Sequence, residues 1–275
     1  MTTTKKVTAF VGAARKKHTY NAARQFLDNL QSLGAVETEI VRLSDYRLEA
    51  CRGCKVCFMR GEEFCPLKDD RDVLIEKMMA SDGVVFASPN YSFQLSALLK
   101  IFLDRLGFVF HRPCFFGKAF TSIVSQGFYG GGKIEKYLDF VGKGLGFNTV
   151  KGSVFTALEP MMENEKRKMD KAIADQSRRF YERMMKPTLD TPNWFWLMGF
   201  RGGRTNVRLE CEESDRDFIY YTERGWLESD YFYPVRLGLF KKLGGRFFDS
   251  LTTRMSRKRR GLLKRQNGLK QTWGD

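Results

Sequence analysis

The sequence predicts an α/β protein built on a doubly wound parallel sheet with helices on both faces. Short apolar runs alternate with amphipathic helical segments through the first two-thirds of the chain, which is the pattern of such a sheet. The chain has 275 residues, 43% of them hydrophobic, so it can form one large domain or one domain with an appendage.

The first elements predict a strand, a helix and a second strand. Residues 6–12 are an apolar run that ends in glycine, as expected of a buried strand. Residues 19–33 repeat apolar side chains at helical spacing, and Gly34 ends that helix. Residues 36–43 alternate between polar and apolar, which is typical of a half-buried edge strand.

The middle of the chain continues the same alternation after a long loop at 44–68. Asp69 and Asp70 are positioned to cap a helix over 70–80. Residues 83–88 then predict a third, buried strand, and a helix follows over about 94–106.

Two further strands complete a predicted sheet of five. Residues 118–126 form the fourth strand, and three glycines lead into a helix that ends near residue 144. Residues 148–157 form the fifth strand and 161–186 a long charged helix. The alternation then stops, so we predict a domain over 1–186 and an extension over 187–275 with aromatic and then basic amphipathic sequence.

The net charge of +15 is unevenly distributed along the chain. Residues 231–275 hold twelve Lys or Arg against two Asp or Glu, and apolar side chains recur among them at helical spacing. Such a tail can be a solvated helix docked through its apolar side, or it can bind an anionic membrane or an acidic protein. A nucleic-acid role is disfavoured because no recognised reading motif accompanies the charge.

Three loops follow the carboxyl ends of predicted strands, where ligands bind in sheets of this kind. The loop at 12–20 is basic and opens a helix, which predicts a phosphate site or simply a basic turn. The loop at 88–93 contains Pro and Tyr and could hold a flat ring, or it could be only a rigid turn. The loop at 125–132 is rich in glycine, which favours close backbone approach to a ligand or a flexible turn.

Four of the six cysteines fall within fifteen residues, at Cys51, Cys54, Cys57 and Cys65. A secreted disulfide scaffold would spread them, so this clustering predicts a metal or redox site. The N-terminal apolar stretch is short and is interpreted as the first strand of a cytoplasmic protein, and no apolar run is long enough to predict a membrane span.

These motifs together resemble the flavodoxin-like NAD(P)H-dependent FMN reductases, particularly their iron–sulfur flavoprotein branch. Four segments match in order over residues 1–186: GAARKKHT after the first strand, the cysteine motif followed by two aspartates, SPNYSFQLSALLKIFLDR, and SQGFYGGG. The resemblance implies a five-stranded sheet of order 2-1-3-4-5 and an FMN site at the three loops. It assigns no catalytic residue, because the flavin itself would carry the electrons.

The resemblance also implies which side chains surround FMN. Those around the phosphate would be Arg15, His18, Thr19 and Tyr20. Those bordering the isoalloxazine would be Pro89, Asn90, Tyr91 and Ser92. Those closing its other side would be Gln126, Gly127 and Tyr129. Ala13 and Ala14 stand where the family's loop has Ser and Pro, which removes one hydroxyl donor.

The cysteine motif leaves three alternatives open. Its spacing resembles that of iron–sulfur flavoproteins, where four thiolates hold a [4Fe–4S] cluster; here these would be Cys51, Cys54, Cys57 and Cys65. Zinc also takes four thiolates but more often uses two separated pairs. The third alternative is a set of empty thiols in a protein that carries flavin alone.

The expected function is therefore an FMN-dependent oxidoreductase. Electrons would come from NAD(P)H or, if a cluster is present, from a ferredoxin-like donor. The alternative is a non-catalytic FMN electron carrier whose basic tail docks an acidic redox partner or a membrane. The family also implies a homo-oligomer, a dimer or tetramer, because a second subunit commonly completes the FMN edge.

Overall fold

The computed structural model describes residues 4–271, with side chains as far as residue 262. The chain divides into two compact units, which are described separately below. The first contains residues 4–53 and 66–188, and the second contains 54–65 and 189–271. The second unit therefore includes most of the cysteine segment in addition to the C-terminal extension.

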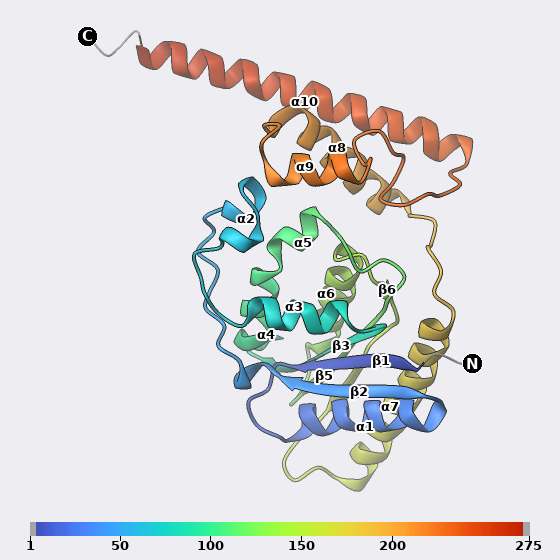
Figure 1. Cartoon of the computed structure of the whole chain (residues 1–275). Helices are drawn as coiled ribbons and strands as arrows, with labels where there is room; N and C mark the ends of the chain where they lie inside the picture. Colours follow the sequence, from blue (N-terminus) through green and yellow to red (C-terminus); the bar gives the residue numbers. More distant parts are fainter. Residues whose placement is uncertain (1–3, 272–275) are drawn as a thin grey trace. The chain divides into compact units, whose positions relative to one another are not determined.

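The first unit contains the predicted parallel sheet, with its strands in flavodoxin-like order (Figure 1). The order is β2-β1-β3-β5-β6, with β7 beside β5 and a short β4 antiparallel to β3. The strands have the following bounds: β1 Lys5–Val11, β2 Val36–Arg42, β3 Gly83–Tyr91, β4 Gln94–Leu95, β5 Ala119–Gln126, β6 Asn148–Thr149 and β7 Ser153–Thr156. The predicted fold class is confirmed, and the sheet has seven strands where five were predicted.

The two extra strands have different origins. The short β4 turns back and pairs with the end of β3, and the predicted fifth strand is split into β6 and β7. The predicted fifth strand is divided into β6 and β7 because the amide of Gln176 inserts beside it. Gln176 Nε2 donates to the carbonyl oxygen of Ser122 at 2.9 Å and to Thr121 Oγ1 at 2.7 Å. Gly152 passes so close to Ser122 that a Cβ there would lie 2.5 Å from the Ser122 carbonyl oxygen. The side-chain amide of Gln176 thus donates to a carbonyl group of β5 that would otherwise accept from a backbone N–H of the neighbouring strand.

Helices cover both faces of the sheet, as Figure 1 shows. Helices α1 (His18–Leu33) and α7 (Glu163–Met185) lie on one face, where Phe26 and Phe180 pack edge to face at 5.3 Å. The other face is covered by α3 (Arg71–Met79), α4 (Ala97–Arg105), α5 (Gly107–His111) and α6 (Gly131–Gly144). A short 3-10 helix (Leu43–Asp45) follows β2.

The core under the second face is aromatic. Phe86 of β3 meets Phe10 of β1 at 5.8 Å and Phe120 of β5 at 5.1 Å between ring centroids. Phe102 of α4 stacks on Phe10 at 5.6 Å, and all four rings are buried. Because the side chains alternate along each strand, the residues next to these rings supply the core beneath α1 and α7. The sheet is therefore rigid on both faces below the loops that follow its strands.

The second unit is helical and has its own small core. It contains α2 (Val56–Met59), a 3-10 helix (Glu62–Phe64), α8 (Trp194–Glu210), α9 (Arg216–Glu223) and α10 (Leu239–Gln271). Trp226 is buried against Tyr221 at 5.2 Å and Phe232 at 4.8 Å. Helix α10 packs along α8, and α9 contacts both α2 and α8. Among residues 4–271, no helix is both long enough and apolar enough to cross a membrane.

Candidate functional site

The last residues of β3 and β5, together with the loops that follow β1, β5 and β7, line one cavity of about 230 Å³ in the first unit. The carboxyl ends of parallel strands lie at one edge of the sheet, so loops distant in sequence meet there. The lining residues are Ala13, Arg15, Lys17, His18, Thr19, Pro89, Asn90, Tyr91, Ser125, Gln126, Gly127, Ala157 and Glu159. All three loops singled out from the sequence contribute to it.

One end of the cavity is cationic. Helix α1 begins at His18, so its first N–H groups and the positive end of its dipole lie at the cavity wall. Arg15 and Lys17 add side-chain charge, and there is no acidic residue in the first turn of α1. Thr19 Oγ1 lies 2.6 Å from Ser125 Oγ, which links this loop to the end of β5. These groups form what we call the cationic cradle: Arg15, Lys17, His18 and Thr19.

A carboxylate from the last loop lies against the cradle. Lys17 Nζ donates to both carboxylate oxygens of Glu159 at 2.9 Å, and His18 Nε2 lies 3.4 Å from one of them. The hydrogen bond from Lys17 and its charge lower the pKa of Glu159, and His18 and Arg15 add smaller effects in the same direction. Glu159 is therefore an anion above that lowered pKa. Its charge offsets part of the positive charge of the cradle.

The opposite side of the cavity is formed by the second and third loops. Asn90 Nδ2 donates to the Tyr129 carbonyl oxygen at 2.8 Å, and Gln126 Oε1 accepts from the Gly131 N–H at 2.8 Å. The Asn90 Oδ1 atom is buried and has no hydrogen-bond partner among the described residues. A ligand N–H could satisfy it, because a buried acceptor without a donor is costly.

Glycine is required where the third loop turns. Gly130 has φ +97, and a Cβ there would lie 3.0 Å from Cδ1 of Phe93. Phe93 and Tyr129 pack with ring centroids 5.2 Å apart, so the second and third loops are joined by an aromatic contact as well as by Asn90. Tyr91 is 53% exposed and Phe128 82% exposed, which leaves flat apolar surface near the cavity.

Eight of the eleven residues expected around FMN line the cavity. They are Arg15, His18, Thr19, Pro89, Asn90, Tyr91, Gln126 and Gly127. The remaining three do not line it. Tyr20 is buried, with Lys16 Nζ 5.8 Å from its ring centroid, because it points into the core side of α1. Ser92 is exposed at a left-handed turn with φ 49, and Tyr129 contributes its carbonyl group to Asn90.

Five lining residues were not among those expected: Ala13, Lys17, Ser125, Ala157 and Glu159. Lys17 and Ser125 stand directly beside expected residues, so the loop position was a usable signal. Glu159 was not detectable in this way, because the fifth strand was expected to continue to residue 157 and a helix to begin at 161. Only the end of β7 at Thr156 turns this segment toward the cavity.

The cavity fits a phosphorylated, flat ligand such as FMN. Its cationic end offers backbone N–H groups, two cationic side chains and hydroxyl groups, which is the chemistry that binds phosphate. The orphaned Asn90 Oδ1 and the exposed Tyr91 belong to the same lining and could accommodate a ring with N–H donors. The cofactor-binding assignments themselves remain predictions.

The four clustered cysteines differ in exposure and in the unit to which they belong. Cys51 and Cys54 are exposed, whereas Cys57 and Cys65 are half-buried. Among the described residues, no group of three or more His, Cys, Asp or Glu is gathered so that it could hold a metal ion. Cys51 belongs to the first unit and the other three to the second. The [4Fe–4S] cluster, zinc and empty thiols therefore all remain predictions.

The aspartate pair that follows the cysteines holds the start of their loop. Asp69 Oδ2 accepts from the Glu49 N–H at 2.8 Å, and Asp70 Oδ2 accepts from the Arg47 N–H at 2.7 Å. Asp69 Oδ1 also forms a 2.8 Å ion pair with Arg105, and both side chains are almost fully buried. Asp70 is the N-cap residue of α3, as predicted, but its side chain makes no capping hydrogen bond. Asp69 Oδ1 instead accepts from the Arg71 N–H at 3.3 Å.

The comparisons with known proteins agree with this geometry. Residues 5–159, more than half of the chain, match the model of the NADPH-dependent FMN reductase family. The class defined by fold and site is thus that of the flavodoxin-like oxidoreductases. The chain belongs to the NADPH-dependent FMN reductase family and is a flavin-dependent oxidoreductase.

Two curated relatives carry the name iron-sulfur flavoprotein. One, from Archaeoglobus fulgidus, is 33% identical over 165 residues, which cover 54% of this chain and 71% of the relative. Another, from Methanocaldococcus jannaschii, is 37% identical over 101 residues, which cover 36% of this chain and 51% of the relative. With the second relative, the match spans about half of that protein's length.

Solved structures show the same fold at low sequence identity. RosB with a bound intermediate, 8-demethyl-8-formylriboflavin-5'-phosphate, has a TM-score of 0.57 at 13% identity and covers 86% of this chain and 92% of its own. An apo NADH:FMN oxidoreductase has a TM-score of 0.50 at 17% identity and covers 69% of this chain and 97% of its own. These likenesses concern the fold alone.

Proposed function

We propose that the cavity binds FMN with the phosphate in the cationic cradle, and that the protein passes electrons from NAD(P)H to an acceptor. The observation that carries this proposal is the meeting of three separate loops around a cavity with a cationic end. The family description, NADPH-dependent FMN reductase, supports the donor. Bound FMN would supply the hydride and electron chemistry, since no side chain of the cavity needs to act as a redox group.

The residues of the chain bind and orient the cofactor in this proposal. Lys17 and the first N–H groups of α1 would neutralise the phosphate, while Thr19 is held in place by Ser125. Asn90 Oδ1 would accept from a ring N–H, and the hydrogen bond from Asn90 Nδ2 to Tyr129 fixes that orientation. The exposed rings of Tyr91 and Phe128 offer the flat surface on which a nicotinamide can stack.

Glu159 would have to release Lys17 when the phosphate enters. Its carboxylate already forms two 2.9 Å contacts with Lys17, so cofactor and carboxylate compete for the same cation. Two anions close together repel each other. The proposal therefore includes a displacement of the Glu159 side chain when FMN binds.

Apoprotein titrated separately with FMN and riboflavin tests the cradle, because riboflavin lacks only the phosphate. We expect flavin fluorescence to be quenched by FMN binding, with riboflavin at least about tenfold weaker, the minimum loss for a charge-assisted contact. Equal affinities would show that the cradle does not hold the phosphate. A protein that binds neither flavin would refute the proposal as a whole.

Steady-state turnover then separates an enzyme from a carrier. With FMN bound and a quinone or free flavin as acceptor, we expect sustained NADPH or NADH oxidation. Reduction of the bound flavin for a single turnover only, with no further oxidation of the nucleotide, would favour the electron carrier.

No electron-transfer step is assigned to the cysteine segment, because its thiols are not gathered around a common point in the described residues. Iron, sulfide and zinc analysis of anaerobically purified protein distinguishes a cluster, a zinc site and empty thiols. Since the cysteine side chains do not line the cavity, we expect C54S/C57S to keep its FMN affinity within about twofold. A larger loss would connect the cysteine segment to the flavin site.

A further inference from the structure

Helix α10 uses one face to pack on α8. Gly244 and Gly245 allow close approach, since a Cβ on Gly244 would lie 2.4 Å from the Trp194 ring. Phe248 then meets Trp194 with ring centroids 6.3 Å apart, and one helical turn beyond it Thr252 lies over Gly202. These positions recur at spacings of three and four residues, so they form one face of the helix.

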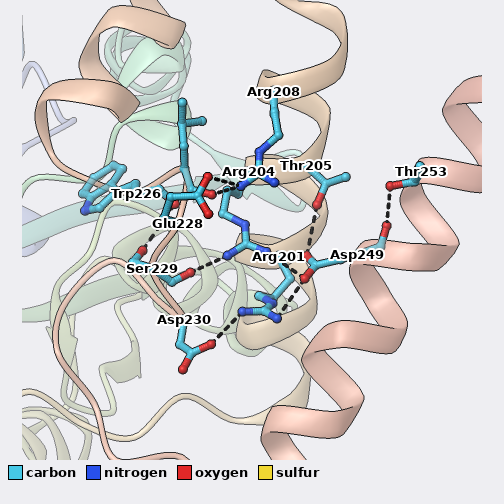
Figure 2. Close-up of polar contacts among 11 residues, drawn as sticks. Arg201, Arg204, Thr205, Arg208, Trp226, Glu228, Ser229, Asp230, Asp249 and Thr253 are labelled. Atoms are coloured by element: carbon cyan, nitrogen blue, oxygen red, sulfur yellow. Dashed lines mark hydrogen bonds and ion pairs between the residues drawn. The ribbon is translucent and has the colours of Figure 1, made fainter.

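Polar contacts on the same face of α10 also join it to α8, as Figure 2 shows. Asp249 of α10 accepts from Arg201 at 2.8 Å, from Arg204 at 2.7 Å and from Thr205 at 3.0 Å. Arg201 also pairs with Asp230 at 2.8 Å. Asp249 is the only acidic residue in the sequence of α10, and its carboxylate is paired with side chains of α8.

The rest of the helix surface carries an apolar stripe, which Lys258 interrupts between Met255 and Leu262. Phe240 is 86% exposed, Phe247 62% and Met255 64%. These side chains lie away from α8, and the spacing of the set places it along one side of the helix over about 33 Å. The members of the stripe are Phe240, Leu243, Phe247, Leu251, Met255 and Leu262.

Cationic side chains border this stripe without acidic partners. At 3.6 residues per turn, Arg246 and Arg257 flank the stripe on the side away from α8, and Arg254 and Lys258 lie within it. Lys242 and Arg259 lie farther round the helix. All six are exposed and none has an ion pair with a described residue. The outward surface of α10 is therefore apolar and cationic, with no acidic group among its described side chains.

We propose that α10 lies in the plane of an anionic membrane surface, with its apolar stripe inserted at the level of the headgroups. The flanking Lys and Arg would reach back to lipid phosphates, while their aliphatic stems cover apolar surface. A bilayer fits better than an acidic protein because the stripe is long and straight and its cations are distributed along the whole helix. The proposal does not depend on the flavin site.

The test uses the full-length protein in a flotation assay with two kinds of vesicles, phosphatidylcholine alone and phosphatidylcholine with phosphatidylserine. We expect binding to the anionic vesicles that weakens as salt is raised, and little binding to the neutral ones. Poly-glutamate serves as the acidic macromolecule. Binding to poly-glutamate without binding to anionic vesicles would overturn the proposal in favour of an acidic protein partner.

Two double variants separate the cationic and apolar contributions. Each Lys or Arg at an anionic surface strengthens binding about fivefold, so R254Q/R257Q should weaken vesicle binding about 25-fold. F247S/L251S removes two inserted side chains and should weaken binding by at least about tenfold. All four positions are exposed, and far-UV circular dichroism checks that each variant is folded.

Matched controls change equivalent residues outside α10. R167Q/K168Q removes two exposed charges from α7, and V73S/L189S removes two half-exposed apolar side chains. We expect both controls to bind anionic vesicles like the wild type. Wild-type binding by F247S/L251S, or equal losses in the controls and the α10 variants, would overturn the proposal.

Discussion

The molecule contains two groups of basic side chains that look alike in sequence and differ in surroundings. The cationic cradle has Arg15, Lys17 and His18 around a cavity, and Glu159 is the one acidic residue among the described residues that line it. In the second unit, Arg201 and Arg204 are about 95% buried between α8 and α10. Burial and the neighbouring Arg201 lower the pKa of Arg204, while Asp249 acts in the opposite direction.

The difference shows what makes a basic group a ligand site. In the α8–α10 network the cations are paired with carboxylates and carbonyl groups of the protein itself, so the network joins two helices (Figure 2). In the cradle a single carboxylate faces several cations and the dipole of a helix, so positive potential remains available to an anion. A group of cations that is buried and paired within the protein holds helices together, whereas a group that is exposed and has few internal partners can bind an anionic ligand.

The largest effect expected from this comparison is on stability. D249A leaves Arg201 and Arg204 buried without their shared carboxylate, which should cost about 3 kcal/mol of unfolding free energy. All four tryptophans are at residue 194 or beyond, so tryptophan fluorescence during urea denaturation reports on the second unit.

The control for this change is E228A, which removes the exposed partner of Arg208 in the same unit. An exposed pair of this kind contributes about 0.5 kcal/mol or less. If D249A were as mild as that control, the network would be solvated in solution and the contrast with the cradle would be lost.

A smaller effect is expected on ligand affinity. K17A should weaken FMN binding about tenfold and leave riboflavin binding unchanged, because Lys17 lines the cavity and would contact only the phosphate. The neighbouring K16A is a matched control, since Lys16 lies over the Tyr20 ring outside the cavity lining. Isothermal titration of both flavins measures the difference. Equal losses in the two variants would indicate a general charge effect.

The smallest expected effect is a gain in FMN affinity rather than a loss. E159Q should strengthen FMN binding about threefold, because it frees Lys17 and removes an anion from the cradle. E163Q, on an exposed residue in the first turn of α7, is the control. Weaker FMN binding in E159Q would mean that the carboxylate supports the bound cofactor. Unchanged affinity would place it outside the phosphate site.

Much of the first unit could be predicted from periodicity. The third strand was predicted over 83–88 and extends to Tyr91, and the helix predicted over 19–33 begins one residue earlier at His18. The spacing of apolar residues and the glycines that end strands and helices are local features of the sequence, so they are sufficient to locate these strands and helices. The split of the fifth strand was not predictable, because it depends on Gln176, more than twenty residues further along the chain.

The cavity could be predicted in part for the same reason. Loops that follow buried strands were identifiable in sequence, and eight expected residues line the cavity they form. Tyr20 could not be excluded, since the rotation of α1 about its axis decides whether a side chain faces the core or the cavity. Glu159 depends on where β7 ends, which is set by contacts across the sheet.

The sequence by itself determined the order of strands and helices, the position of the strand-end loops and the amphipathic, basic nature of α10. These features follow from the spacing of residue types along the chain. The tertiary structure alone decided which cations are buried and paired and which stay open to a ligand. That distinction depends on contacts between residues far apart in sequence, such as Lys17 with Glu159 and Arg201 with Asp249, which no local pattern records.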